Sequence, residues 1–225
     1  MSQKKQCARY DGYEESDSLS YQYMEFMTNH VMNLVLHCLT VTRDPYMCRP
    51  PTPHFPALIV FSGTQNAKDL LVDDFDIRRA KWPQSGQPRG HVHKGFARRT
   101  SVLLERMKLF TASHDDFVIA GHSLGGACAV LAASDLTRSG KRVRSVYTFG
   151  SPRMATPEFR SVYTHEQSLS AVSYHFATPN DPIIHRIPYI FDSIGCYEPL
   201  PFHDVSDWVH HDIRSYNAAL QAKDG

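Results

Sequence analysis

The segment at residues 121–125, which reads G-x-S-x-G around Ser123, constrains this 225-residue chain more than any other stretch. An apolar, partly β-branched run at residues 117–120 precedes it, and small residues with helical character follow at 127–133. A strand, a tight turn and a helix in this order form the context of a nucleophile elbow. Such a turn strains its serine and brings neighbouring backbone close, so Gly121 and Gly125 are expected to leave room that a Cβ would fill. The alternative is a glycine-rich turn with an incidental serine.

The composition bounds the class of protein. A hydrophobic fraction of 42% supports one substantial core, so we expect residues 18–225 to form a single domain after a flexible N-terminal segment, 1–17. The chain has 24 Lys and Arg against 23 Asp and Glu, a net charge of +1. This near-neutrality argues against nucleic acid or an anionic membrane surface as the main partner.

The sequence also bears on the compartment. No apolar core of a signal peptide follows Met1, and no run reaches the roughly 18 apolar residues of a spanning helix. The five cysteines are scattered and fit reduced thiols, which favours a cytoplasmic protein. A disulfide between Cys48 and Cys196, export by another route and cleavage from a precursor are the alternatives.

Short apolar runs beginning near residues 57, 117, 143 and 171 alternate with helical segments. This alternation predicts an α/β fold with a mostly parallel central sheet and helices on both faces. Apolar residues at helical spacing also predict a helix from Ser18 to Leu39. The proline-rich residues 43–56 are expected to be a loop or extended, and residues 77–92 a surface loop that either covers an active site or merely connects two elements.

Three of the predicted strands end in residues that carry candidate chemistry. Thr64, Ser123 and Asp181 lie at such ends, and the carboxyl ends of parallel strands share one edge of a sheet. A serine nucleophile needs a base, and the base needs a carboxylate that fixes its tautomer. When a nucleophile elbow supplies the serine, the acid and then the histidine follow along the chain. Asp181 is favoured as the acid over Asp192, while Asp135 lies in the helix of the elbow itself.

Several histidines are available as the base. His203, His210 and His211 all follow at a useful distance, whereas His185 stands too close to the favoured aspartate. The start of the last predicted helix would hold His210 or His211 rigidly. The acidic cluster at residues 69–76 is either a metal site or, more simply, a solvated helix face.

With these residues in place, the sequence resembles the fungal-type (class 3) triacylglycerol lipase family of the α/β-hydrolase superfamily. Five matching segments and a closing His–Tyr pair occur in order over about residues 57 to 220. These are Ile59–Thr64 with Asp73 behind it, His93–Phe96, Gly121–Ala127, Thr148–Arg153, Asn180–Ile183, and His211 with Tyr216.

The resemblance implies a role for each matching residue. Ser123 is the nucleophile, Asp181 orients the base, and His211 is the base because Tyr216 follows it at the family's spacing. The resemblance further implies an oxyanion hole, a support for it and a lid. Those positions are Thr64 and the backbone N–H of Leu124 for the hole, Asp73 and Gly63 for the support, and residues 74–92 for the lid.

The resemblance implies a serine hydrolase that cleaves carboxylic esters, above all acylglycerols, without a metal or cofactor. Its partner would be a lipid or other ester substrate at a membrane or lipid-droplet surface. The alternatives are a catalytically silent lipase-like binding module, a phospholipase A1 or carbohydrate esterase of the same family, and a metal-dependent hydrolase that uses the acidic cluster. Ser62, Leu70 and the polar, basic lid segment depart from the family pattern, and they argue against long-chain triglyceride at an interface.

Overall fold

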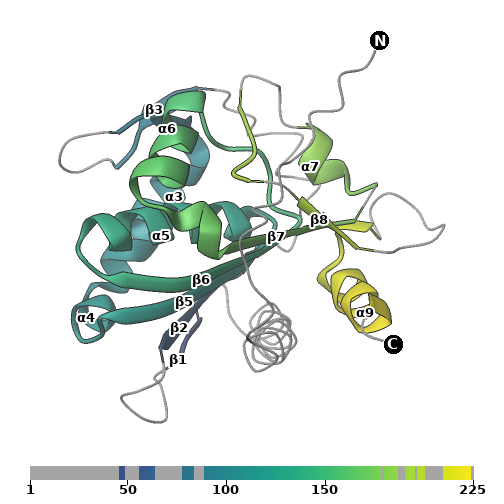
Figure 1. Ribbon diagram of the computed structural model, residues 1–225, viewed down its shortest axis with the longest axis horizontal. Coiled ribbons are helices and arrows are strands. Elements are labelled where there is room, and N and C mark those ends of the chain that lie inside the picture. The colour runs from purple at the N-terminus through teal and green to yellow at the C-terminus, as the bar shows by residue number, and fades with distance from the viewer. Residues whose placement is uncertain are drawn as a thin grey trace, which may run out of the picture.

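The computed structural model describes residues 46–48, 56–63, 78–83, 89–178, 180–186, 191–195, 197–200 and 210–223 (Figure 1). The helix predicted from Ser18 to Leu39 and the acidic cluster at 69–76 lie outside these residues. Cys128 is a free, buried thiol, and the proposed disulfide between Cys48 and Cys196 lies outside what the structure describes.

A six-stranded sheet forms the centre of the fold, in the order β1-β2-β5-β6-β7-β8. Its strands are β1 Tyr46–Cys48, β2 Ala57–Phe61, β5 Asp116–His122, β6 Arg142–Phe149, β7 Ser173–Ala177 and β8 Tyr197–Pro199. Only β1 pairs antiparallel, with β2, and all the other pairs are parallel. The predicted mostly parallel sheet is therefore confirmed. The strand β1 agrees with the extended alternative for residues 43–56, whereas the sequence pattern misses β8; both are three residues long and lie in proline-containing segments.

Helices cover both faces of this sheet (Figure 1). The described helices are α3 Lys94–Arg106, α4 Lys108–Ala112, α5 Leu124–Arg138, α6 Pro157–Ser161, the π-helix η1 Val162–Glu166, the 3₁₀-helix η2 Leu169–Val172, α7 Pro182–Arg186 and α9 Ile213–Lys223. The helix α5 of the elbow packs against α3 on one face, and α9 lies on the other.

Alternate side chains of β5 enter two different hydrophobic clusters. Phe117 and Ile119 pack in the cluster that contains α5, whereas Val118 and Ala120 pack in the cluster that contains Tyr216 of α9. Successive side chains of a strand point to opposite faces, so a strand covered on both sides is apolar throughout. This is why the run before the elbow reads as continuous rather than alternating.

Residues 78–83 and 89–93 are not the surface loop that the sequence suggests. They form a hairpin of β3, Arg79–Lys81, and β4, His91–His93, paired antiparallel. Trp82 is only 1% exposed, and the backbone of β4 bonds to Met154 and bridges to Ala155. One face of the described part of the candidate lid, with Trp82 and Val92, is therefore packed against the body of the protein, while Arg79 and Lys81 are exposed. The rest of that segment lies outside the described residues.

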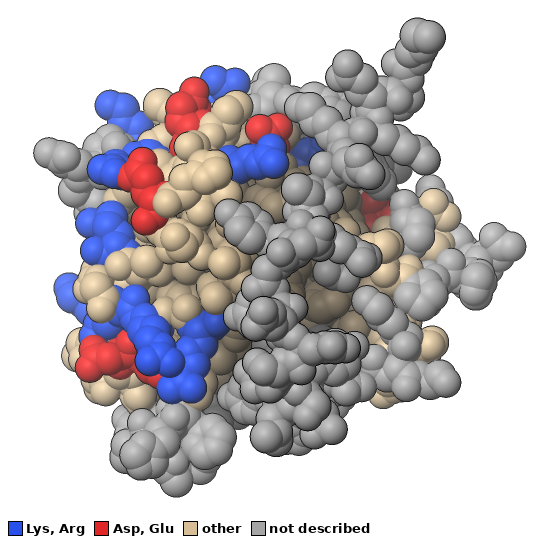
Figure 2. Space-filling model, viewed as in Figure 1, with Lys and Arg blue, Asp and Glu red and all other residues tan. Residues whose placement is uncertain are grey.

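Charges of both signs share the described part of the surface. In Figure 2, Lys and Arg stand next to Asp and Glu around an uncharged area. Ion pairs such as Arg138 with Asp135 at 3.0 Å and Lys141 with Asp115 at 2.7 Å account for this mixing. Of the helices that the structure describes, none is both long enough and apolar enough to span a bilayer.

Candidate active site

Ser123 lies in the turn between β5 and α5 and is fully buried. Its φ of 56° and ψ of −129° are strained for a residue with a side chain. A Cβ on Gly121 would overlap the carbonyl oxygen of Gly125, and a Cβ on Gly125 would overlap that of Phe61. The expected close approach of backbone at the elbow is confirmed. The Ser123 N–H donates to the carbonyl of Phe149 at 2.9 Å, which ties the turn to the end of β6.

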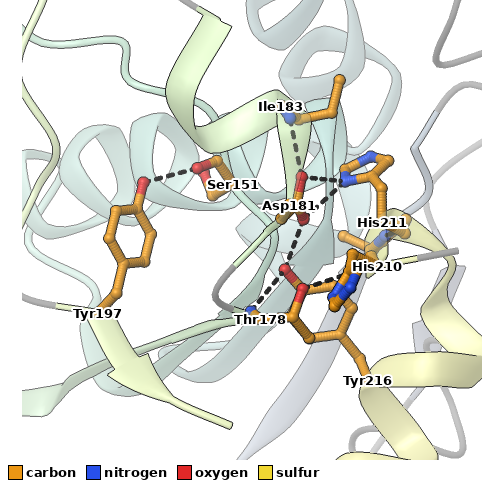
Figure 3. A network of polar contacts seen from close by, with 9 residues as sticks. Ser151, Thr178, Asp181, Ile183, Tyr197, His210, His211 and Tyr216 are labelled. Atoms are coloured by element: carbon orange, nitrogen blue, oxygen red, sulfur yellow. Dashed lines mark hydrogen bonds and ion pairs between the residues drawn. The ribbon is translucent and has the colours of Figure 1, made fainter. Parts of the chain in front are cut away.

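Asp181 lies just past the end of β7 and immediately before α7, and it is fully buried. Its carboxylate accepts three donors (Figure 3): the Ile183 N–H at 2.8 Å, the Tyr216 hydroxyl at 2.6 Å, and Nδ1 of His211 at 2.9 and 2.8 Å from its two oxygens. A buried charge is costly unless it is hydrogen-bonded, and here both oxygens are satisfied.

The contact with Asp181 fixes the tautomer of the neutral His211 ring. A carboxylate is an acceptor, so Nδ1 carries the proton and Nε2 of the neutral ring presents its lone pair. His211 is 3% exposed. Its Nε2 and the Oγ of Ser123 are both buried, and neither has a hydrogen-bond partner among the described residues. The imidazole nitrogen and the hydroxyl thus both have unused hydrogen-bonding capacity, and no hydrogen bond joins them in this structure.

The alternative acids and bases occupy other positions. The backbone carbonyl of His210 accepts the Thr178 hydroxyl at 2.8 Å, while the ring of His211 contacts the carboxylate. Asp192 bridges to Ala155 through its backbone, and its carboxylate lies 4.0 Å from the guanidinium of Arg160. The side chain of His185 and all of His203 lie outside the described residues.

Tyr216 makes a contact that the sequence reasoning did not assign. Its hydroxyl donates to Asp181 and accepts the Thr178 N–H at 3.3 Å. Burial and the nearby negative charge raise the pKa of Tyr216 well above its ordinary value, so it remains a donor. The only sequence signal for Tyr216 is its position five residues after His211, which favours His211 over His210 as the base.

His122 is the second residue that sequence reasoning left without a role. It precedes Ser123 in the elbow, and its Nε2 lies 2.8 Å from the backbone carbonyl oxygen of His211. Burial, followed by the repulsion of a charged His211, lowers the pKa of His122 to about 3. The ring is therefore neutral near pH 7, and its Nε2–H donates to that carbonyl.

The expected oxyanion hole is described in part. Gly63 follows β2 and is buried, and a Cβ there would lie 3.1 Å from the Cβ of Ser123. Leu124 begins α5, and the first N–H groups of a helix have no intrahelical acceptor. Both residues thus border the serine, whereas Thr64 and Asp73 lie outside the described residues.

Neither a metal centre nor a hollow in the surface competes with this network among the described residues. Within the described ranges, no group of three or more His, Cys, Asp or Glu side chains is placed to hold a metal ion. Two hollows of about 600 and 590 Å³ lie beside Trp82 and Arg138, and Ser123 lines neither of them. The polar network of Figure 3 is therefore the best-supported candidate site.

Gly150 offers a test of how tightly this network is packed. Its φ is +57°, and a Cβ would lie 2.6 Å from Oδ2 of Asp181 and 3.1 Å from Nδ1 of His211. Gly140 has a φ of +79° with nothing within 4 Å of such a Cβ. We expect both Gly→Ala variants to lose about 1–2 kcal/mol of stability from the left-handed backbone.

Only Gly150→Ala should also lower kcat, by about 10²-fold, because it displaces the imidazole–carboxylate pair. Urea unfolding and steady-state kinetics on a short ester measure the two effects. Equal kcat values for Gly150→Ala and Gly140→Ala would show that the network tolerates the displacement.

Comparison with known proteins identifies the family of this chain. Residues 58–191 match the family described as Lipase (class 3). Toxin TseL of Vibrio cholerae is 32% identical over 120 residues, which are 52% of this chain and 18% of the toxin. Secreted mono- and diacylglycerol lipase 1 of Fusarium solani is 36% identical over 106 residues, which are 44% of this chain and 31% of that protein. The chain thus matches less than a third of the length of either relative.

A solved structure shows the same fold. The lipase from Rhizopus microsporus var. chinensis superposes with a TM-score of 0.54 at 20% identity, over 74% of this chain and 70% of that one. The family match covers more than half of this chain, from β2 to beyond β7. The chain belongs to the class 3 lipase family and has an α/β-hydrolase fold.

Proposed function

We propose that this protein hydrolyses carboxylic esters of lipids, with Ser123 as nucleophile, His211 as general base and Asp181 as the residue that orients the base. One observation supports this above all others. The His211 ring is held by both oxygens of the buried Asp181, so that Nε2 is left with its lone pair. The ring of His122, the residue before the strained serine, stands 4.8 Å from the ring of His211.

Acylation follows from these roles. The Ser123 Oγ attacks the ester carbonyl carbon while its proton passes to Nε2 of His211, and the carbonyl oxygen becomes an oxyanion. The N–H of Leu124 and the Thr64 hydroxyl and backbone stabilise that oxyanion. The tetrahedral species then collapses. The bond to the leaving alkoxide breaks, and His211 returns the proton to that oxygen, so that an alcohol departs from an acyl-serine.

In deacylation, water takes the place of Ser123 as the nucleophile. His211 takes a proton from water while the oxygen of that water attacks the acyl carbon, and a second oxyanion forms in the same hole. On collapse, the proton returns to Ser123 and the carboxylic acid leaves. Asp181 stabilises the imidazolium in both halves of the cycle through its contact with Nδ1.

Acylglycerols are the proposed substrate class. The family supports a lipid ester, and the relative from Fusarium solani is named as a mono- and diacylglycerol lipase. A lipid substrate would be met at a membrane or lipid-droplet surface. The charged exterior of the described hairpin, in which Arg79 and Lys81 are exposed, favours short-chain or partial glycerides over long-chain triglyceride at an apolar interface.

The test combines covalent labelling with a substrate panel. We expect a fluorophosphonate to modify one residue, mapped to Ser123 by peptide mass spectrometry, and to abolish hydrolysis of a short p-nitrophenyl ester. Activity should be unchanged by a metal chelator. Mono-, di- and triacylglycerols of several chain lengths, with and without micelles, then rank the substrates. Failure to label, together with no turnover of any ester, would favour a lipase-like binding module instead.

A further inference from the structure

His122 connects the nucleophile elbow to the candidate base through one hydrogen bond. It is the last residue of β5 and the neighbour of Ser123, and its Nε2 lies 2.8 Å from the backbone carbonyl oxygen of His211, 89 residues away in sequence. The two rings are inclined by 31° with centroids 4.8 Å apart. The ring centroids of His122 and Tyr216 are 6.0 Å apart, with the ring planes inclined by 68°. These contacts join the serine's own strand to the base and to the tyrosine on Asp181.

This contact requires a proton on Nε2, and a neutral histidine supplies it. A carbonyl oxygen accepts only, so Nε2 must carry a proton while Nδ1 does not need one. The charges that face the ring are His211, Asp181 and Asp212, and burial outweighs the attraction of the two carboxylates. A second imidazolium here would also repel the imidazolium that His211 becomes during acylation. The neutral ring therefore supplies a donor without a competing charge.

The position of the His211 ring depends on its main chain as well as on its contact with Asp181. Asp181 fixes one edge of the imidazole, but the backbone that carries it lies just before α9, whose first residue is Ile213. A hydrogen bond to the carbonyl of His211 fixes the main chain as well. Together with the hydrogen bond from the Thr178 hydroxyl to the carbonyl of His210, these contacts define where Nε2 lies relative to the elbow, and a displacement of 1 Å at a reacting group costs about 10²-fold in rate.

We propose that His122 is a positioning residue of the triad, which holds the main chain of His211 through its Nε2–H so that Nε2 of His211 meets the hydroxyl of Ser123. This inference rests on the proposed function, because it requires His211 to be the base. The hydrogen bond of His122 is to the main chain of His211, so in this role it acts through His211.

Substitutions that separate the hydrogen bond from packing test this. His122→Gln keeps a neutral N–H donor at a similar reach, whereas His122→Leu keeps bulk without a donor and His122→Asn places its amide short of the carbonyl. His175 provides a matched control, since it is also a buried histidine, 3% exposed, with its Nδ1 2.7 Å from the Thr148 hydroxyl. His175→Leu removes a buried imidazole that takes no part in the proposed reaction.

The expected result is a loss of kcat of about 10²-fold in His122→Leu and His122→Asn, with KM nearly unchanged and most of kcat recovered in His122→Gln. The rate of fluorophosphonate labelling should follow kcat. Thermal unfolding and His175→Leu report what the loss of a buried imidazole does to stability alone. If His122→Leu fails to fold, the pair of Asn and Gln variants carries the same comparison.

Equal kcat values for the Gln variant and the donor-less variants would overturn the proposal. So would a kcat loss in His122→Leu no greater than that in His175→Leu. Wild type and Ser123→Ala are measured in parallel. Activity that survives in Ser123→Ala would reject the proposed function itself, whereas serine-dependent activity without a Gln rescue would reject only the role of His122.

Discussion

Replacing Ser123 with alanine is expected to lower kcat for ester hydrolysis by about 10⁴-fold or more, because no other group can form the acyl-enzyme. The same change should leave stability nearly unaltered. The Oγ of Ser123 has no hydrogen-bond partner among the described residues, so its removal breaks no bond there. Steady-state kinetics on a p-nitrophenyl ester and thermal unfolding of the same preparation measure both effects.

Ser134→Ala is the matched control for this prediction. Ser134 is a buried serine of α5, the helix that follows Ser123, and its hydroxyl donates to Gln167 at 2.8 Å. Loss of that bond should cost about 1 kcal/mol of stability and leave kcat close to wild type. The two variants should therefore show opposite signatures. Residual activity of Ser123→Ala within tenfold of wild type would assign the reaction to another nucleophile.

The elbow and its neighbours could be predicted because local sequence determines them. The apolar run before Ser123, the small residues after it and the two flanking glycines together specify a strand, a strained turn and a helix. Asp181 could be predicted because parallel strands bring their carboxyl ends to one edge. Those inferences need only the spacing of apolar residues within each segment and the order of the segments along the chain.

Other features depend on contacts between distant segments. The sequence cannot show that Trp82 is buried, because its hairpin is held against the rest of the protein by backbone hydrogen bonds between β4 and residues 154–156. Nor does a three-residue strand such as β8 have enough length to show a period. The role we propose for His122 depends on a carbonyl group 89 residues away, and backbone groups leave no trace in side-chain patterns.

Asp181→Asn is expected to lower kcat by about 10⁴-fold at neutral pH, for a reason specific to the contacts of this carboxylate. The Ile183 N–H donates to Oδ1, while Tyr216 donates to Oδ2. The amide oxygen of an asparagine would therefore stay at the Ile183 N–H, and its NH₂ group would take the place of Oδ2, the carboxylate oxygen nearer to Nδ1 of His211. His211 would then accept at Nδ1 and carry its proton on Nε2, where it could not take the proton of Ser123.

Tyr216→Phe separates this tautomer effect from a general disturbance of the network. It removes one donor from Asp181 but leaves a carboxylate opposite Nδ1, so the ring of His211 keeps its reactive tautomer. A hydrogen bond to a charged group is worth about 1.5–3 kcal/mol, which limits the loss of kcat to about 100-fold. Kinetics of the two variants on the same ester, with ¹⁵N chemical shifts of the His211 ring to identify the tautomer, distinguish the effects. If Asp181→Asn lost no more activity than Tyr216→Phe, the carboxylate would only pack the site, and another group would orient the base.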